Sequence, residues 1–229
     1  MSTARWTLLA LSATLPLLSA CAHTLEPYRA PVGAATPRPT GEGWIDLFAP
    51  ENQAAWKNVT DEQKVWEFQD GVMHVLGTPG TEYFAWTTQE FGDFEMHIEF
   101  KVNEGGNSGV FVRTATDDPV QKGMEVQVYG DYGQVPNRNS SGSLYDVACP
   151  MFNMLMPYGE WNSYDITCKG SSLVVVMNGW KILDLDLSKM TTPIGKFDTP
   201  LAQLPQKGHI ILQDHGAEVW FRNLVVKPL

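Results

Sequence analysis

After residue 43, apolar and polar residues alternate with a period of two along much of the chain. The clearest run covers residues 94–101, in which Phe94, Met96, Ile98 and Phe100 alternate with Glu95, His97, Glu99 and Lys101. Such alternation predicts a strand that buries one face and leaves the other in water. One strand rarely supplies three metal ligands, so we interpret His97 and its two glutamate neighbours as a solvated or convex face.

Further strands are predicted where the same alternation recurs between turn residues: 108–113, 124–129, 163–168, 173–177, 180–185, 209–213 and 218–226. Asn178-Gly179 between two of them is a strong signal for a tight hairpin. No segment shows a long 3.6-residue apolar period, so we expect an all-β fold of two antiparallel sheets packed face to face. Residues 130–160 are poor in strand signal, and a loop of this length is usually functional or a lid.

The first 21 residues have the parts of an export signal: Arg5, an apolar run from Trp6 to Leu18, and small residues before Cys21. The run is too short to span a bilayer comfortably. Leu18-Ser19-Ala20-Cys21 resembles the lipobox of bacterial lipoproteins, which implies cleavage before Cys21 and acylation of its sulfur and new amino group. Because Ala22 follows, the resemblance implies an outer-membrane lipoprotein of the cell envelope. The alternative is an ordinary signal peptide cut at a small residue.

The remainder of the chain divides into two parts. Residues 22–42 contain four prolines among Ala, Thr and Gly, and we interpret them as a flexible tether. Residues 43–229 have the length of one β-sandwich domain. With 26 acidic and 16 basic residues the net charge is −10, which makes nucleic acid an unsuitable partner because phosphate binding needs clustered cations. Aromatic rings suit sugar binding, but eight Trp and seven Tyr are also compatible with core and rim positions.

Two cysteines lie within the domain, Cys149 in an expected loop and Cys168 in an expected strand. An oxidising compartment permits a disulfide between them, and two buried thiols are an equal alternative. Neither has the context of a catalytic nucleophile.

Polar residues with catalytic potential occur at two places. Glu125 and Gln127 are two positions apart on one expected strand, so both project from one face, where they can hold sugar hydroxyls or remove a proton. Gln213-Asp214-His215-Gly216 stands at a strand end, and histidine is suited to proton transfer near neutral pH. A solvated strand face and a hydrogen-bonded turn are the respective structural alternatives.

Asn107 and Arg113 flank an apolar strand and are expected on one face. Arg113 either stabilises an oxyanion or pairs with Glu125, or else makes a structural salt bridge. Asp131 and Tyr145 belong to the long loop, and Trp161 is a rim or turn candidate. The domain has no cysteine-rich zinc motif, phosphate loop, dinucleotide motif or Gly-x-Ser-x-Gly elbow.

Taken in order, several segments resemble the 3-keto-disaccharide hydrolase domain family, over roughly residues 43–229. They are Asn107-Ser108-Gly109-Val110-Phe111-Val112-Arg113, Gly123-Met124-Glu125-Val126-Gln127-Val128, Ser141-Gly142-Ser143-Leu144-Tyr145-Asp146, Gly159-Glu160-Trp161-Asn162, Leu212-Gln213-Asp214-His215-Gly216 and Phe221-Arg222-Asn223. Each motif is weak alone, but six in order are specific. In one departure Gly130 stands where the family often has an acid, which removes any role of that carboxylate.

The resemblance implies a concanavalin-like, laminarinase-like jelly roll with a ligand groove on its concave sheet. It also implies action on glycosides oxidised at sugar carbon 3, and an upstream dehydrogenase or oxidase that makes the ketone. Such a ketone acidifies the proton on carbon 2 and makes the glycosidic oxygen a β leaving group. A base, an electrophile and an acid then suffice for elimination, after which water adds.

The resemblance and the strand positions together give the candidate site. We expect Glu125 and His215 as base and acid, with Arg113 stabilising oxygen. Substrate contacts are expected from the remaining polar and aromatic candidates: Asn107, Gln127, Asp131, Tyr145, Trp161 and Gln213. No cofactor is expected, although some carboxylates could hold Ca²⁺.

Two other functions compete with this one. A non-catalytic carbohydrate-binding jelly roll needs no titratable group at its centre, so Glu125 and His215 favour an enzyme. A laminarinase-like retaining hydrolase needs Glu-x-Asp-x-x-Glu on one strand, and Gln127 stands where a carboxylate is required.

Overall fold

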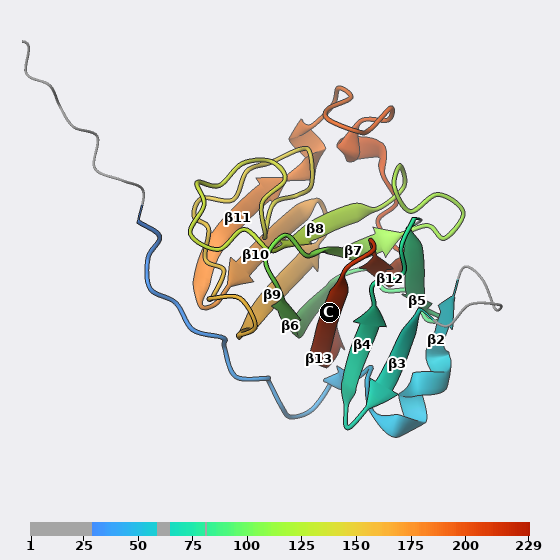
Figure 1. The fold of residues 1–229 in the computed structure, drawn as a ribbon. Coiled ribbons are helices and arrows are strands. Elements are labelled where there is room, and N and C mark those ends of the chain that lie inside the picture. Colours follow the sequence, from blue (N-terminus) through green and yellow to red (C-terminus); the bar gives the residue numbers. More distant parts are fainter. Residues whose placement is uncertain (1–28, 59–64, 81) are drawn as a thin grey trace, which may run out of the picture.

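The computed structural model describes residues 29–58, 65–80 and 82–229, so the predicted leader and Cys21 lie outside the described residues. Two antiparallel sheets form a sandwich (Figure 1). No helix in these ranges is long and apolar enough to cross a membrane. Three short 3₁₀ turns are present, η1 (Pro50–Ala55), η2 (Leu187–Lys189) and η3 (Leu201–Gln203).

The larger sheet has eight strands in the order β11-β10-β9-β6-β13-β4-β3, with β1 also paired to β13. Its strands are β1 (Ile45–Asp46), β3 (Trp66–Gln69), β4 (Val72–Leu76), β6 (Phe94–Val102), β9 (Trp161–Lys169), β10 (Ser172–Met177), β11 (Trp180–Asp186) and β13 (Glu218–Pro228). The smaller sheet has the order β2-β5-β12-β7-β8. Its strands are β2 (Trp56–Asn58), β5 (Tyr83–Thr87), β7 (Asn107–Thr114), β8 (Met124–Tyr129) and β12 (His209–Asp214). The predicted strands and the all-β sandwich are confirmed.

The core lies between the sheets and follows the alternation of the sequence. From the larger sheet, the apolar residues of β6 are buried, and from the smaller sheet those of β7 and β8 face them: Phe94, Met96, Ile98, Phe100, Val110, Val112, Val126 and Val128. Burying each such side chain contributes about 1.5–3 kcal/mol before entropic costs. The hairpin at Asn178-Gly179 has both residues at positive φ, 50° and 82°, as a tight two-residue turn requires.

The outer face of β6 is not solvated, and that prediction is wrong for His97 and Glu99. Both side chains are buried. His97 Nδ1 lies 2.7 Å from Asp165 Oδ1, and Glu99 accepts hydrogen bonds from Arg222 and Asn223 of β13. Polar side chains at alternate positions therefore pair with one another under a covering segment instead of facing water.

That covering segment is the proline-rich stretch before the domain, whose residues 29–42 we term the strap. The Thr36 backbone N–H donates to Ser163 Oγ at 2.8 Å, and its hydroxyl donates to Asp165 at 2.6 Å. The Ala34 N–H donates to the Asn178 carbonyl. Figure 1 shows the strap descending beside β9 and the long loops. For this part, the prediction of a flexible tether is wrong, because prolines favour an extended chain whose polar groups here find partners on the sheet.

Residues 130–160 contain no strand of either sheet, as predicted, yet they are packed closely against the sandwich. Three backbone hydrogen bonds join the stretch around Ser143 to β8, including Tyr145 N–H to the Glu125 carbonyl at 2.9 Å. Met154 is buried in the core, whereas Met151 is exposed. The loop thus occupies the free edge of β8 and carries Tyr145 to Glu125.

The two cysteines are free thiols. Cys168 is buried, and burial raises its pKa to about 12, whereas Cys149 is exposed. Neither the disulfide nor the pair of buried thiols is observed.

Candidate functional site

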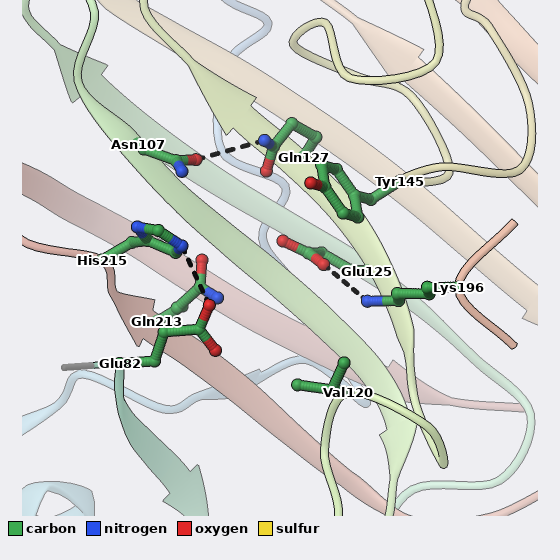
Figure 2. A pocket seen from close by; sticks show the side chains of 9 residues that line it. All are labelled: Glu82, Asn107, Val120, Glu125, Gln127, Tyr145, Lys196, Gln213 and His215. Carbon is green, nitrogen blue, oxygen red and sulfur yellow. Dashed lines mark hydrogen bonds and ion pairs between the residues drawn. The ribbon is translucent and has the colours of Figure 1, made fainter.

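A small cavity of about 60 Å³ opens on the outer face of the smaller sheet. Side chains from β7, β8 and β12 and from the flanking loops converge on it (Figure 2). They are Glu82, Asn107, Val120, Glu125, Gln127, Tyr145, Lys196, Gln213 and His215. Six of the nine predicted site residues therefore meet in one place.

The pleat of the sheet explains how the central residues gather. Glu125 and Gln127 leave β8 on the outer face while Val126, between them, enters the core. On the neighbouring strand Gly109 pairs with Gln127. A Cβ atom at position 109 would lie 2.7 Å from Glu125 Oε1, so glycine leaves the space that this carboxylate occupies.

Glu125 and Lys196 form the buried ion pair of the site, with Oε2 and Nζ 2.8 Å apart. Burial raises the pKa of Glu125, and the ammonium of Lys196 opposes that shift. The Lys196 Nζ also lies 5.1 Å from the centre of the Tyr145 ring and 5.3 Å from that of Phe111. The cavity therefore places a base and a cation side by side in a largely dry environment.

Lys196 and Glu82 were not among the residues predicted from the sequence. Lys196 lies in an irregular stretch without alternation, 71 residues from Glu125. The neighbouring Gly195 has φ +57°, and a Cβ there would lie 2.1 Å from the Asp146 carbonyl oxygen. Glycine at position 195 allows this loop to approach Asp146 closely. The Gly195-Lys196 dipeptide was therefore the one feature of the sequence, a weak one, that could have indicated Lys196 as a site residue.

His215 stands at the opposite side of the cavity (Figure 2), just beyond β12. Its Nε2 lies 2.9 Å from Glu82 Oε1, and 42% of its side chain is exposed. The preceding Asp214 is buried and accepts hydrogen bonds from the backbone N–H groups of Thr78 and Gly216, which fixes the turn. An imidazole held by a carboxylate at a half-open mouth can exchange protons with both ligand and water.

Amide side chains form the polar wall between these two pairs. Gln127 Nε2 donates to Asn107 Oδ1 at 3.1 Å. The side-chain Oε1 atoms of Gln127 and Gln213 are buried and have no hydrogen-bond partner. Buried acceptors without partners cost free energy, which a ligand hydroxyl recovers. Burial, followed by the nearby Glu125 carboxylate, raises the pKa of Tyr145, which therefore remains a hydrogen-bond donor at neutral pH.

Arg113 lies outside the cavity and makes structural contacts. The structural salt bridge is therefore observed, and neither a place in the site nor a pair with Glu125 is. Its φ is +51°, and the register between β7 and β12 shifts at this point, so the alternation that placed it beside Asn107 is broken. The guanidinium donates to the carbonyls of Gly92 and Gly170 and pairs with Asp93 at 2.8 Å. Lys196 takes the place beside Glu125 that Arg113 was predicted to occupy.

Two expected substrate contacts are also absent from the cavity lining. Asp131 is buried within the long loop, where burial raises its pKa and its backbone carbonyl accepts a hydrogen bond from Asn153. The Trp161 ring lies on the larger sheet under the Arg222 guanidinium, 4.0 Å from its centre. At Gly130 a Cβ would lie 2.0 Å from the Asn103 carbonyl oxygen, so an acid does not fit this backbone.

No group of three or more His, Cys, Asp or Glu among the described residues is arranged to hold a metal ion. What the cavity does contain is a buried carboxylate beside a cation, a half-exposed histidine, a phenol and free amide acceptors. On the outer face of the smaller sheet, this combination provides acid, base and hydrogen-bonding groups in one place, as an enzyme that acts on a polar substrate requires.

The comparisons with known proteins identify the family. Residues 43–227 match the 3-keto-alpha-glucoside-1,2-lyase-like domain, and the chain belongs to that family. It is 30% identical to a 3-keto-disaccharide hydrolase from Bacteroides thetaiotaomicron, over 82% of this chain and 79% of the relative.

Solved structures agree with this assignment. A protein from Parabacteroides distasonis that is proposed to be a glycosyl hydrolase superposes with a TM-score of 0.72 at 30% identity, covering 81% of this chain and 99% of that one. A β-glucanase from Bacillus licheniformis has a TM-score of 0.52 at 13% identity, covering 83% of this chain and all of the other. The latter likeness confirms the concanavalin-like jelly roll alone.

Proposed function

We propose that this enzyme cleaves 3-keto-glycosides by elimination followed by hydration. The observation that carries the proposal is the buried pair of Glu125 and Lys196 beside two acceptors that lack partners. A carboxylate whose pKa burial raises is a stronger base than an exposed one. A carbon acid next to a ketone needs such a base, together with a cation for the oxygen that becomes negative.

In the first step Glu125 takes the proton from carbon 2, and the electron pair of that C–H bond forms a carbon 2–carbon 3 double bond. The carbon 3 oxygen becomes an enolate, which the Lys196 ammonium and the Tyr145 hydroxyl stabilise. In other enzymes one such donor accelerates the reaction by about 10²–10³-fold.

In the second step the carbonyl at carbon 3 re-forms, a carbon 1–carbon 2 double bond appears and the glycosidic bond breaks. The departing oxygen takes a proton from His215, which Glu82 orients. Water then adds across the new double bond, its oxygen to carbon 1 and a proton to carbon 2, so the sum is hydrolysis. The side-chain Oε1 atoms of Gln127 and Gln213 accept hydrogen bonds from sugar hydroxyls.

The location and supply of substrate belong to the same proposal. We place the enzyme at the outer membrane through acylated Cys21, which the lipobox-like segment supports. The substrate must come from a reaction that oxidises carbon 3 of a glycoside, so a sugar dehydrogenase or oxidase is its expected source.

The test compares a chromogenic 3-keto-glucoside with the unoxidised glucoside, using Glu125→Gln, Lys196→Met and His215→Ala. Release from the keto compound alone, reduced by each substitution, is expected. Lys189→Met is the matched control, because Lys189 is an exposed lysine outside the cavity. If the protein binds glycans but releases the chromophore from neither compound, it is a tethered carbohydrate-binding module and the proposed enzyme activity is wrong.

A further inference from the structure

Large apolar side chains are exposed on one end of the molecule, away from the cavity. Of the seven that are exposed among the described residues, five belong to the strap, the long loop and the start of β11: Val32, Tyr132, Val135, Met151 and Trp180. We term these five the apolar end. None of them lines the cavity that contains Glu125.

Contacts join the three segments that carry the apolar end. The indole N–H of Trp180 donates to the Val32 carbonyl at 3.1 Å. The Trp180 ring also packs edge-on against Phe152, next to Met151 in the chain, at 5.9 Å between centres. Val32 and Tyr132 line one cavity of about 450 Å³ between the strap and the loop. Three segments far apart in sequence therefore build one surface.

The chain that leads to this surface limits what can cover it. Seven residues separate Arg29 from Cys21, so the sulfur lies within about 28 Å of Arg29 along a fully extended chain. Since the strap is held to the sheet by Thr36 and Ala34, the domain cannot move away on residues 29–42. Acylation of Cys21 would therefore keep the start of the strap, and with it the apolar end, within about 28 Å of the point at which the chain enters the bilayer.

The chemistry of the surface also suits a lipid interface. Trp, Tyr, Val and Met can enter the headgroup region with their apolar parts while Trp and Tyr keep a polar atom in water. Arg29, at the start of the strap, lines the same cavity and can contact lipid phosphates. The protein as a whole carries a net charge of −10, so attraction to anionic lipid is local to this end.

From these observations we propose that the apolar end lies on the membrane, so that the lipoprotein rests on the bilayer in a fixed orientation instead of swinging on a tether. The proposal rests on acylation of Cys21 and is independent of the reaction. The partner is a phospholipid surface, and a second copy of the chain is the competing occupant.

The test uses the full chain expressed with its leader in a bacterial host, extracted and reconstituted into phospholipid vesicles with brominated acyl chains. Subtracting the emission of Trp180→Phe from that of the unsubstituted protein isolates Trp180, and Trp220→Phe does the same for a control tryptophan. Trp220 is partly buried on the larger sheet, stacked on His74 at 4.9 Å. We expect bromolipid to quench the emission of Trp180 at least about twofold more than that of Trp220, because an indole ring at the membrane interface lies close to the brominated chains.

A second variant keeps the test decisive if Trp180→Phe perturbs the turn. Replacing Val32 and Met151 by serine in the protein that keeps Trp180 should reduce bromolipid quenching of its total tryptophan emission, while cleavage of the 3-keto-glucoside is unchanged. Equal quenching of both tryptophans overturns the proposal, as does mass spectrometry that finds no acyl group on Cys21. A detergent-solubilised dimer that the serine variant dissociates assigns the surface to a second copy instead.

Discussion

Replacing Lys196 by Met tests the electrostatic core of the site, because it removes a cation while keeping a long apolar side chain. At 2.8 Å and an effective dielectric constant of 20, the attraction between Lys196 and Glu125 is about 6 kcal/mol, much of it offset by desolvation of the two charges. Removing one partner of a buried pair typically costs about 3–5 kcal/mol unless the other becomes neutral. Glu125 is therefore expected to take up a proton in the variant.

Loss of Lys196 should make the unfolding free energy of the protein depend more strongly on pH. Burial already raises the pKa of Glu125, and loss of the opposing ammonium raises it further. A carboxyl group whose pKa is higher in the folded than in the unfolded state stabilises the fold fully at low pH, and that contribution is lost as pH rises through the folded pKa. Lys196→Met should thus lose more unfolding free energy at pH 8 than at pH 5.

Two assays measure the effect. Urea unfolding at pH 5 and pH 8 gives the stability difference, and kcat/KM on the 3-keto-glucoside against pH gives the catalytic one. The rate at neutral pH should fall about 10²–10³-fold, with its acidic limb displaced to higher pH. A stability loss that is the same at both pH values, together with a rate loss below tenfold, would show that Lys196 does not stabilise the charge of Glu125 or of the reacting oxygen. The exposed Lys189→Met should change neither.

Three further substitutions separate the site from its scaffold. Gly109→Ala puts a Cβ 2.7 Å from the Glu125 carboxylate, so kcat should fall at least about tenfold with little change in the urea midpoint; unchanged kcat contradicts the close approach. Arg113→Leu should lower the unfolding free energy by about 3 kcal/mol, since it removes a buried cation with four hydrogen bonds. Its KM, measured on folded protein, should be unchanged, and a raised KM would return Arg113 to the site. Thr36→Val removes the hydroxyl that bonds Asp165 and should cost about 1 kcal/mol; faster hydrogen exchange in the strap alone checks it.

Much of the fold could be predicted from alternation, because a half-buried strand has a period of two in its own sequence. The same rule placed Glu125 and Gln127 on one face correctly, since β8 is regular between them. It failed at Arg113, where positive φ and a register shift break the period. A single β-bulge is a local irregularity of the backbone, and the pattern of apolar residues does not predict it.

Other errors came from contacts between distant segments. Lys196 reaches Glu125 from an irregular loop 71 residues away, and no periodicity carries such information. His97 was expected on a solvated or convex face that it shares with Glu95 and Glu99, but Asp165 pairs with it, and Thr36 of the strap donates to the same carboxylate. Polar groups that satisfy one another can be buried, and sequence patterns identify the polarity without identifying the partner.

If Glu125 removes the proton on carbon 2, deuterium from the solvent should enter that position during cleavage. The 3-keto-glucoside is cleaved in D₂O, and deuterium at carbon 2 of the released sugar is measured early in the reaction. Enzyme-free incubation of the keto sugar supplies the correction for spontaneous exchange. Elimination by Glu125 predicts close to one deuterium at carbon 2 per cleavage, and loss of both cleavage and label in Glu125→Gln. Cleavage without label above the enzyme-free control would contradict elimination and show direct hydrolysis at carbon 1.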